Sequence, residues 1–212
     1  MIRFLLHSAF FLDNLILIDP HDGGSIGLPR PEVKAPLVLI THNHYDHNAY
    51  EIIPHETVKV RFYGEFNYKN YTIQGLKSYH DKEKGKRRGE TAIYKITSPD
   101  GRVYVHLGDL GHMLDEKTVK ELKNPDYLMA PVGGVITISP SEALQIVKEL
   151  NPKIVFPMHY WVKGHYMPLE PIEPFLELAN KEGIKTVPLP KNEVNEESVE
   201  KGTVIYYSNN LT

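Results

Sequence analysis

The sequence predicts an α+β protein in which two β-sheets pack face to face and helices cover the outside. Short runs rich in β-branched and aromatic residues dominate the first half of the chain, whereas strand-like and helix-like segments alternate in the second half. A chain of 212 residues with 41% hydrophobic content can bury one sizeable core and is short for two. We therefore expect one domain over residues 1–212, with two packed sheets rather than a doubly wound one.

The chain is expected to open with a β-hairpin. Two apolar runs, residues 4–12 and 15–19, flank the polar pair Asp13 and Asn14, which is a turn signal. A connection rich in glycine and proline follows, and the apolar run of residues 37–40 then ends just before a cluster of histidines. Later runs with strand character cover residues 58–66, 71–80, 91–97, 102–109, 127–132, 153–160 and 203–207.

Helical patterns are fewer and lie mostly in the second half of the chain. The clearest cover residues 115–122, 139–150 and 171–183. Ser139 or Ser141 is the expected N-cap of the second of these helices, and Gly183 is the expected stop of the third. The stretch of residues 190–201 is the most polar part of the chain, and we expect a solvated loop or a fraying turn there.

The composition narrows the classes of function to expect. A formal charge of -3 gives no excess of Lys and Arg, so no nucleic-acid partner is expected. Cysteine is absent, which rules out disulfides, thiolate nucleophiles and cysteine-ligated zinc. The N-terminal apolar run lacks a small-residue cleavage site, and no segment has the roughly 18 apolar residues that a membrane span needs. A cytoplasmic protein is expected.

Three histidines and an aspartate crowd the end of a buried strand, namely His42, His44, Asp46 and His47. In an extended chain, side chains two residues apart point to the same side, so His42 and His44 can converge on one ion. A helix after Tyr45 would direct Asp46 and His47 to a second ion nearby. A polar loop with satisfied histidines is the alternative, but it explains this density poorly.

Further ligands must come from elsewhere, because a zinc-type site needs more donors than this loop offers. His80, Asp109 and His159 each follow an apolar run and precede a loop signal. Taken singly, each is explained equally well as a core or surface residue. Their recurrence at three strand ends favours one shared site.

These motifs resemble the metallo-β-lactamase superfamily. H-x-H-x-D-H follows a strand, and a His, a Gly-Asp and a further His come later in that order. The pieces HYDHN, HLGDLGH, APVGG, SPSEA and PMHY look most like a branch of small metal-dependent hydrolases that includes ascorbate-phosphate lactonases and N-acyl-phosphatidylethanolamine phospholipases. The resemblance runs from about residue 7 to residue 159. It implies a four-layer αββα sandwich of two mixed sheets, with the site at one edge.

The resemblance also implies a site for two metals. The ligands that it implies are His42, His44 and His80 for one ion, Asp46, His47 and His159 for the other, and Asp109 as the bridge. Two bridged divalent ions lower the pKa of a shared water and hold hydroxide against an electrophilic carbon or phosphorus. Asp46 is expected to orient this nucleophile, which makes Asp46 and Asp109 the predicted catalytic residues. Zinc is the expected metal, although manganese or iron would fit the same donors.

The predicted function is therefore the hydrolysis of an ester, lactone or phosphodiester bond in a small-molecule substrate by a metal-bound hydroxide. A β-lactam is not expected, because the similar branch acts on other substrates. A non-catalytic metal-binding or ligand-sensing protein on the same fold is the alternative. A metal-dependent nuclease is a weaker one, because the chain has no basic bias.

Several residues are candidates for supporting the metals or contacting the substrate. Asp19 resembles an Asp-Pro position of the family that could hydrogen-bond the metal loop, while a simple Asp-Pro turn is the alternative. His7 matches a Gly-His-Ala element of the branch, with Leu6 in place of the glycine. His106 and His112 lie on either side of the Gly-Asp motif and serve either these roles or ordinary packing.

A basic run directly follows His80. Residues 81–90 contain three lysines and two arginines, and a solvated loop is one interpretation. The other is that Arg87 or Arg88 binds an anionic substrate, because a guanidinium pairs with phosphate or carboxylate through two parallel hydrogen bonds. Members of the similar branch often carry Arg-Gly here, which favours Arg88.

Residues 23–27 match the G-x-S-x-G pattern of serine hydrolases. That nucleophile elbow needs a helix immediately after the serine, whereas three prolines follow within residues 28–36. We therefore expect a glycine-rich loop rather than a catalytic Ser25.

Overall fold

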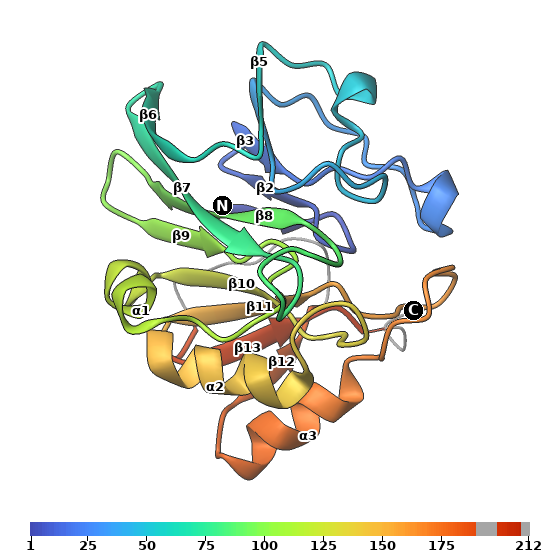
Figure 1. The fold of residues 1–212 in the computed structure, drawn as a ribbon, viewed down its shortest axis with the longest axis vertical. Coiled ribbons are helices and arrows are strands. Elements are labelled where there is room, and N and C mark those ends of the chain that lie inside the picture. The colour runs from blue at the N-terminus through green and yellow to red at the C-terminus, as the bar shows by residue number, and fades with distance from the viewer. Residues whose placement is uncertain (190–198, 209–212) are drawn as a thin grey trace.

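Two mixed β-sheets pack against each other in the computed structural model, which describes residues 1–189 and 199–208 (Figure 1). This arrangement confirms the predicted α+β class. The solvated loop expected over residues 190–201 lies mostly outside the described residues, which resume at residue 199.

The first sheet has five strands in the order β1-β2-β3-β4-β5. Its first three strands are antiparallel, and β3, β4 and β5 are parallel. The strands are β1 (Ile2–Phe4), β2 (Phe10–Leu12), β3 (Ile16–Ile18), β4 (Leu37–Ile40) and β5 (Thr57–Val60).

The N-terminal hairpin is confirmed, with one difference. β2 and β3 pair around a turn in which Asp13 and Asn14 both have positive φ, a conformation that these two residue types tolerate. The first apolar run is not one strand, however. It turns back at Leu6 and His7, where φ is 70° and 56°, and forms β1 and β2.

The second sheet has eight strands in the order β12-β13-β11-β10-β9-β8-β7-β6. Strands β6 to β9 form an antiparallel meander, and β9, β10, β11, β13 and β12 are parallel neighbours. The strands are β6 (Gly64–Tyr68), β7 (Tyr71–Tyr79), β8 (Glu90–Thr97), β9 (Val103–His106), β10 (Tyr127–Pro131), β11 (Ile154–Met158), β12 (Thr186–Pro188) and β13 (Thr203–Tyr206).

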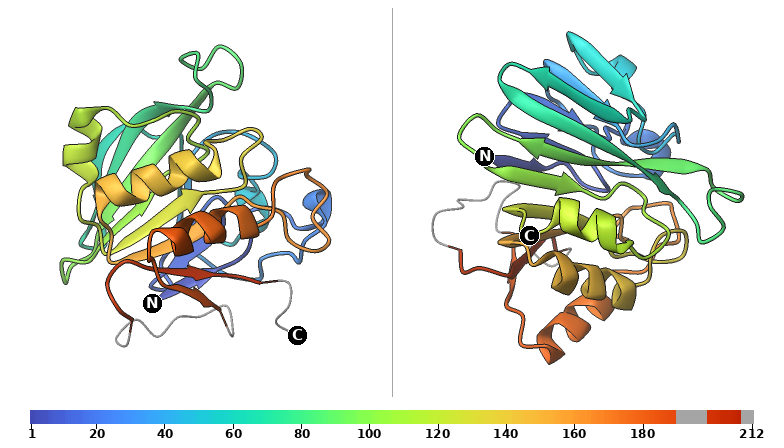
Figure 2. Two further views of the ribbon diagram at one scale, coloured as in Figure 1. Left: turned by 90° about the horizontal axis from the view of Figure 1, so that it is seen from below. Right: turned by 60° about the vertical axis from the view of Figure 1, so that its left-hand side comes forward.

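Helices α1 (Glu116–Leu122), α2 (Pro140–Leu150) and α3 (Glu173–Lys181) lie on the outer side of the second sheet (Figures 1 and 2). α2 packs against β10, and α3 packs against α2 and β12. Of the two serines considered, Ser139 is the N-cap of α2, and it forms a capping box with Glu142. None of the described helices has the length and apolar character needed to cross a bilayer.

The two faces of the first sheet are covered differently. Its inner face, for example Phe10 and Leu39, belongs to the core shared with the second sheet. On the outer face, Val38 packs with Ile53 in a smaller cluster that loops complete. In the described residues this fourth layer holds no α-helix, only the 3-10 helices η1 (Gly24–Ile26) and η2 (Tyr50–Ile52). The prolines of its main connection prevent an α-helix there.

The topology gathers four strand ends at one edge. β8 is antiparallel to both β7 and β9, and β9, β10 and β11 are parallel, so β7, β9 and β11 all end at the same edge of the second sheet. The end of β4 joins them from the first sheet, because the carbonyl of Thr41 accepts a hydrogen bond from the backbone N–H of Ala92 at 2.8 Å. The loops after these strands therefore meet.

Candidate metal centre

The histidine cluster lies in the turn that follows β4. The backbone N–H of His47 donates to the carbonyl of His44 at 2.9 Å, which closes a tight turn. Residues 45–47 form this turn rather than the helix considered after Tyr45. The turn nevertheless separates the side chains, so that Asp46 and His47 face one group of partners and His42 and His44 face another.

The distant candidates meet this turn in two groups. Within each group the potential ligand atoms lie within 4.8 Å of one another. One group contains His42, His44 and His80, and the other contains Asp46, His47 and His159 together with His7. A third set, Asp19 with His42 and His47, overlaps both. The sequence interpretation had grouped the same six residues in the same way, without His7.

Asp109 lies between the two groups. Its Oδ2 atom is 3.4 Å from Nε2 of His42, 3.1 Å from Nε2 of His47, 3.0 Å from Nε2 of His80 and 3.1 Å from Nε2 of His159. Imidazole nitrogens of both groups thus lie close to the same carboxylate oxygen. This is the position that a bridging ligand requires.

Several donor atoms of this cluster are buried and lack hydrogen bonds, although His44 is exposed and Asp46 bonds to His7. Among the described residues, no hydrogen-bond partner is found for either carboxylate oxygen of Asp109, nor for Nε2 of His42, His47 and His159. Leaving a buried polar atom unsatisfied costs about 1–3 kcal/mol. Nitrogen and oxygen donors directed at a common point are the coordination set of a divalent cation, so these residues fit a metal.

Neighbouring side chains fix the protonated nitrogen of two histidines. The Thr41 hydroxyl donates to Oδ2 of Asp19 at 2.6 Å, so it accepts a hydrogen bond from Nδ1 of His42 at 2.9 Å. Nδ1 of His47 likewise donates to Oδ2 of Asp19 at 2.9 Å. In both rings Nδ1 therefore carries a proton and Nε2 faces Asp109. Burial lowers the pKa of His42, so its Nε2 is unprotonated. Against burial, Asp109, Asp46 and Asp19 raise the pKa of His47, so a metal would bind its Nε2 in place of a proton.

The electrostatics of the cluster favour cations. Burial opposes ionisation of Asp109, but the surrounding imidazoles outweigh it and hold its pKa well below the ordinary value. The pKa of Asp46 is lowered in the same way, mainly by His47 and His7 against burial. Burial, with the neighbouring His42 and His80, lowers the pKa of His44 to about 4. The centre thus combines ionised carboxylates with neutral imidazoles at His42 and His44, and with His47, whose pKa the carboxylates of Asp109, Asp46 and Asp19 raise against burial.

His7 and His165 contact the same centre. Nε2 of His7 lies 2.7 Å from Oδ2 of Asp46, and Nδ1 of His7 lies 3.0 Å from Nε2 of His165. The residue before His7, Leu6, takes the place of the glycine of the similar branch and has a φ of 70°, a conformation that costs glycine little. His165 carried no motif signal. It lies six residues after His159, and only the loop after β11 brings it back to the centre.

His106 and His112 support backbone next to the candidate ligands. Nε2 of His106 bonds to the carbonyl of Ser8, and its Nδ1 accepts from the N–H of Gly108. Nε2 of His112 lies 3.2 Å from the backbone nitrogen of Tyr79, the residue before His80. Neither ring has a hydrogen bond to a ligand side chain among the described residues.

The basic run forms a closed turn beside the metal centre. The carboxylate of Asp81 accepts four backbone N–H groups, those of Glu83, Gly85, Arg87 and Arg88, at 2.8–2.9 Å. Burial opposes ionisation of Asp81, but these four donors outweigh it and hold its pKa below the ordinary range. The role of Asp81 was missed in the sequence, although an Asp at the start of a glycine-containing loop is a recognisable signal.

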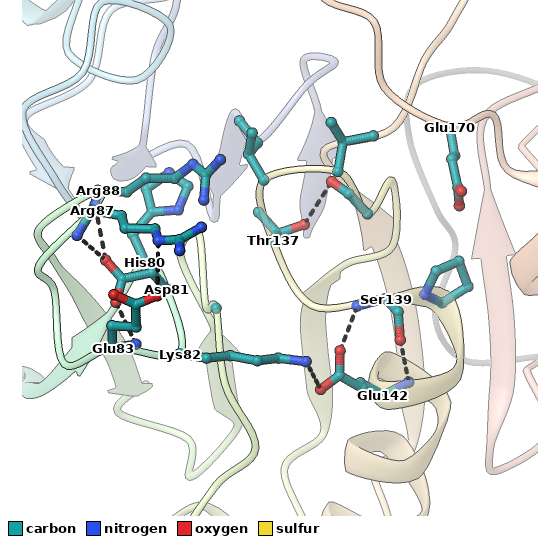
Figure 3. Close-up of a pocket in the computed structure, with 15 residues that line it drawn as sticks. His80, Asp81, Lys82, Glu83, Arg87, Arg88, Thr137, Ser139, Glu142 and Glu170 are labelled. Carbon is teal, nitrogen blue, oxygen red and sulfur yellow. Dashed lines mark hydrogen bonds and ion pairs between the residues drawn. The ribbon is translucent and has the colours of Figure 1, made fainter.

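A cavity of about 450 Å³ opens beside His80 (Figure 3). The turn of Asp81 forms one side, and the segment before α2, with Glu142 and Glu170, forms the other. Lys82 and Arg87 line this cavity but pair with Glu142 and Glu83. Arg88 also lines it and has no carboxylate partner among the described residues.

Ser25 is exposed and lies in η1, a 3-10 helix of three residues within the glycine-rich connection. No α-helix follows it directly in the part of the chain that the structure describes. Its hydroxyl and its backbone N–H both bond to the carboxylate of Asp22, at 2.7 and 2.8 Å. The described residues offer it no histidine as a base.

A sandwich of two mixed sheets with a buried His/Asp cluster at the shared edge defines a metal-binding hydrolase fold. The family model described as Beta-lactamase superfamily domain matches residues 1–159, which end at the last predicted ligand. The chain belongs to this family, and the resemblance seen in its motifs is confirmed.

Named relatives and solved structures agree with this assignment. A UPF0173 metal-dependent hydrolase of Thermococcus onnurineus is 34% identical over an alignment of 187 residues, and the match covers 75% of this chain and 84% of that protein. A UPF0173 metal-dependent hydrolase of Methanobrevibacter smithii is 31% identical, with 75% and 81% covered. A Thermotoga maritima protein assigned as a zinc-dependent hydrolase of the metallo-β-lactamase superfamily superimposes with a TM-score of 0.73 at 29% identity, covering 98% of each chain.

Proposed function

We propose that this metal-dependent hydrolase uses two divalent ions, expected to be zinc, to hydrolyse an ester, lactone or phosphodiester bond in a small anionic substrate. The observation that carries the proposal is the position of Asp109 Oδ2, within 3.0–3.4 Å of Nε2 of four histidines. A single carboxylate oxygen shared by two histidine groups suits a pair of ions better than one.

The chain's own residues have distinct tasks in this proposal. His42, His44 and His80 would hold one ion, Asp46, His47 and His159 would hold the other, and Asp109 would contribute to both. When bound, two such ions lower the pKa of a water and polarise the substrate oxygen. Asp46 is ionised, so it can orient the attacking water by accepting one of its hydrogen bonds.

The cavity beside His80 supports an anionic substrate. Lys82 and Arg87 are neutralised by Glu142 and Glu83, which leaves Arg88 as the cation that can pair with a ligand. A guanidinium binds carboxylate or phosphate through two parallel hydrogen bonds. The proposal is therefore that Arg88 binds an acidic group of the substrate while the scissile bond lies at the metals.

Metal analysis together with a substrate panel tests this function. The panel pairs esters, lactones and phosphodiesters that carry a carboxylate or phosphate with neutral analogues of the same bond. We expect two metals per chain, activity that chelation abolishes and added metal restores, and loss of at least about 100-fold in Asp109→Ala, because removing even an outer partner of a ligand costs about 10–100-fold.

Arg88→Ala tests the substrate class. It should raise KM for the charged members of the panel and leave their neutral analogues unchanged, because the guanidinium contacts the acidic group and not the reacting bond. A two-metal protein that hydrolyses nothing in the panel would favour a metal-binding or ligand-sensing role. Activity that survives chelation would contradict the proposed function.

A further inference from the structure

A chain of hydrogen bonds leads from the loop after β11 to a carboxylate of the metal centre. The backbone N–H of Met167 lies 3.1 Å from Nδ1 of His165. Nε2 of His165 lies 3.0 Å from Nδ1 of His7, and Nε2 of His7 lies 2.7 Å from Oδ2 of Asp46. Both histidines are buried.

The first donor fixes the direction of all three hydrogen bonds. A backbone N–H can only donate, so Nδ1 of His165 accepts and its ring proton is on Nε2. That Nε2–H donates to Nδ1 of His7, which places the proton of His7 on its own Nε2. Nε2–H of His7 then donates to the ionised Asp46. Every link follows from the one before it, and both rings are neutral.

We propose that His7 and His165 are positioning residues that hold Asp46, and that His7 is not a metal ligand. The inference rests on the proposed metal centre, because Asp46 is one of its ligands. A carboxylate oxygen has two lone pairs, so Oδ2 of Asp46 accepts the His7 hydrogen bond and still has one for an ion. Hydrogen bonds to ligating carboxylates fix their orientation and raise metal affinity.

The backbone holds His7 for this task. His7 has a φ of 56°, and its carbonyl accepts the backbone N–H of His159 at 2.9 Å. Its ring lies 4.5 Å from the ring of His159, centroid to centroid. A residue held in the left-handed region costs energy and persists where the surroundings enforce it.

The competing assignment is that His7 is a fourth ligand of the ion held by Asp46, His47 and His159, because its Nε2 lies within reach of those atoms. Ligation requires an unprotonated Nε2. The two assignments therefore place the ring proton on different nitrogens of His7, and they predict different metal contents when His7 is removed.

Three variants test the roles, with zinc affinity measured by competition with a chelator and zinc content measured at saturation. His165→Leu should weaken zinc binding about 10- to 100-fold without changing the content of two per chain. His165→Gln should restore most of the affinity, because its side-chain amide donates where Nε2–H does. His7→Leu should also keep two zinc ions. The exposed His55, whose ring bonds to the carbonyl of Ile53 and belongs to neither ligand group, provides the control variant His55→Leu with wild-type affinity.

Contrary outcomes are clearly separated. Wild-type zinc affinity in His165→Leu would contradict the positioning role of His165. So would a His165→Gln protein whose zinc affinity is no higher than that of His165→Leu. A His7→Leu protein that binds only one zinc would make His7 a ligand. Long-range ¹H–¹⁵N spectra of the wild-type imidazoles, before and after zinc is added, decide the point without any variant.

Those spectra should show Nε2–H in both rings in the metal-free and the zinc-loaded protein. A proton on Nδ1 of His7, or loss of its Nε2–H when zinc binds, would contradict the proposal. If the wild type binds no zinc, the proposed function fails, but the metal-free spectra still test the hydrogen-bond chain.

Discussion

Asp19 is not one of the proposed metal ligands, but its carboxylate lies within 4.8 Å of donor atoms of His42 and His47 and orients both rings. Its carboxylate accepts the backbone N–H and the hydroxyl of Thr41, and it also accepts Nδ1–H of His47. Through Thr41 it fixes the ring proton of His42 as well. One buried carboxylate thus determines which nitrogen two candidate ligands present.

Asp19→Asn should therefore weaken metal binding by about 10- to 100-fold while the fold is kept. The asparagine can adopt the positive φ of 48° found at this position, but it loses one acceptor oxygen and the negative charge. Zinc affinity by chelator competition measures the effect. Asp22→Asn, in the same connection but exposed, is the matched control, and equal affinities in the two variants would contradict this role.

Gly111 allows two loops of the site to pass closely. A Cβ atom at this position would lie 2.3 Å from the backbone nitrogen of Asp81 and 2.4 Å from the carbonyl carbon of His80. Gly111→Ala should therefore destabilise the protein by about 1–3 kcal/mol in urea unfolding and weaken metal binding, because it displaces His80. Gly24→Ala, where a Cβ meets nothing within 4 Å, should change neither. Equal stability of the two variants would refute this account.

At the scale of elements, the turn after β7 is held by a single side chain. Asp81 accepts four backbone N–H groups, so Asp81→Asn replaces one acceptor oxygen with an NH₂ group that repels two of those donors. The turn should then open more often. Because it carries Lys and Arg residues, trypsin should cut it at least several-fold faster, as measured by mass spectrometry of the fragments. Asp115→Asn, which removes the charge but keeps a capping oxygen at the N-cap of α1, is the control that should leave this cleavage unchanged.

The same turn should respond to acid. The pKa of Asp81 is depressed in the folded protein, so its ionised form stabilises the turn above the ordinary Asp pKa of about 4. As the pH falls below that value, the contribution is progressively lost. Amide exchange at Gly85 and Arg88, compared with amides of β10, should show the loss of protection in the wild type, and Asp81→Asn should lack this step. A wild-type turn whose protection is constant down to pH 3 would contradict the assignment.

At the scale of the whole molecule, the sequence predicted the candidate metal ligands better than the residues that hold them in position. His42 and His44 precede a turn at a strand end, and dense histidine patterns of this kind are visible without a structure. His165 was missed because a loop path brings it to His7, and loop paths follow no periodicity. The partners of Asp81 lie within the next seven residues, so its turn was readable from the sequence. The helix considered after Tyr45 is replaced by a single turn, which a hydrogen bond from the N–H of His47 to the carbonyl of His44 closes.

For the fold, too, the sequence predicted the individual elements better than their arrangement. Apolar runs and turn signals located most strands, and capping chemistry at Ser139 located α2. Sheet membership was not readable from those signals. The run of residues 58–66, for example, ends the first sheet with β5 and begins the second with β6. That division depends on contacts between segments distant in sequence, as does the loop layer over the first sheet.

Metal removal should lower the stability of the whole protein, because the ligands join loops of both sheets. The donor atoms of Asp109, His42 and His159 are buried and have no hydrogen-bond partner among the described residues, so a bound ion would remove an unfavourable contribution. A site at a free metal concentration of 100 Kd stabilises by about 2.7 kcal/mol, and each kcal/mol moves the Tm of a chain of this size by about 2–4 °C. Adding zinc to the chelated protein should therefore raise Tm by roughly 5–10 °C per site. Asp109→Ala should show a much smaller rise and Arg88→Ala the full one, whereas an identical Tm with chelator and with zinc would mean that the cluster holds no ion.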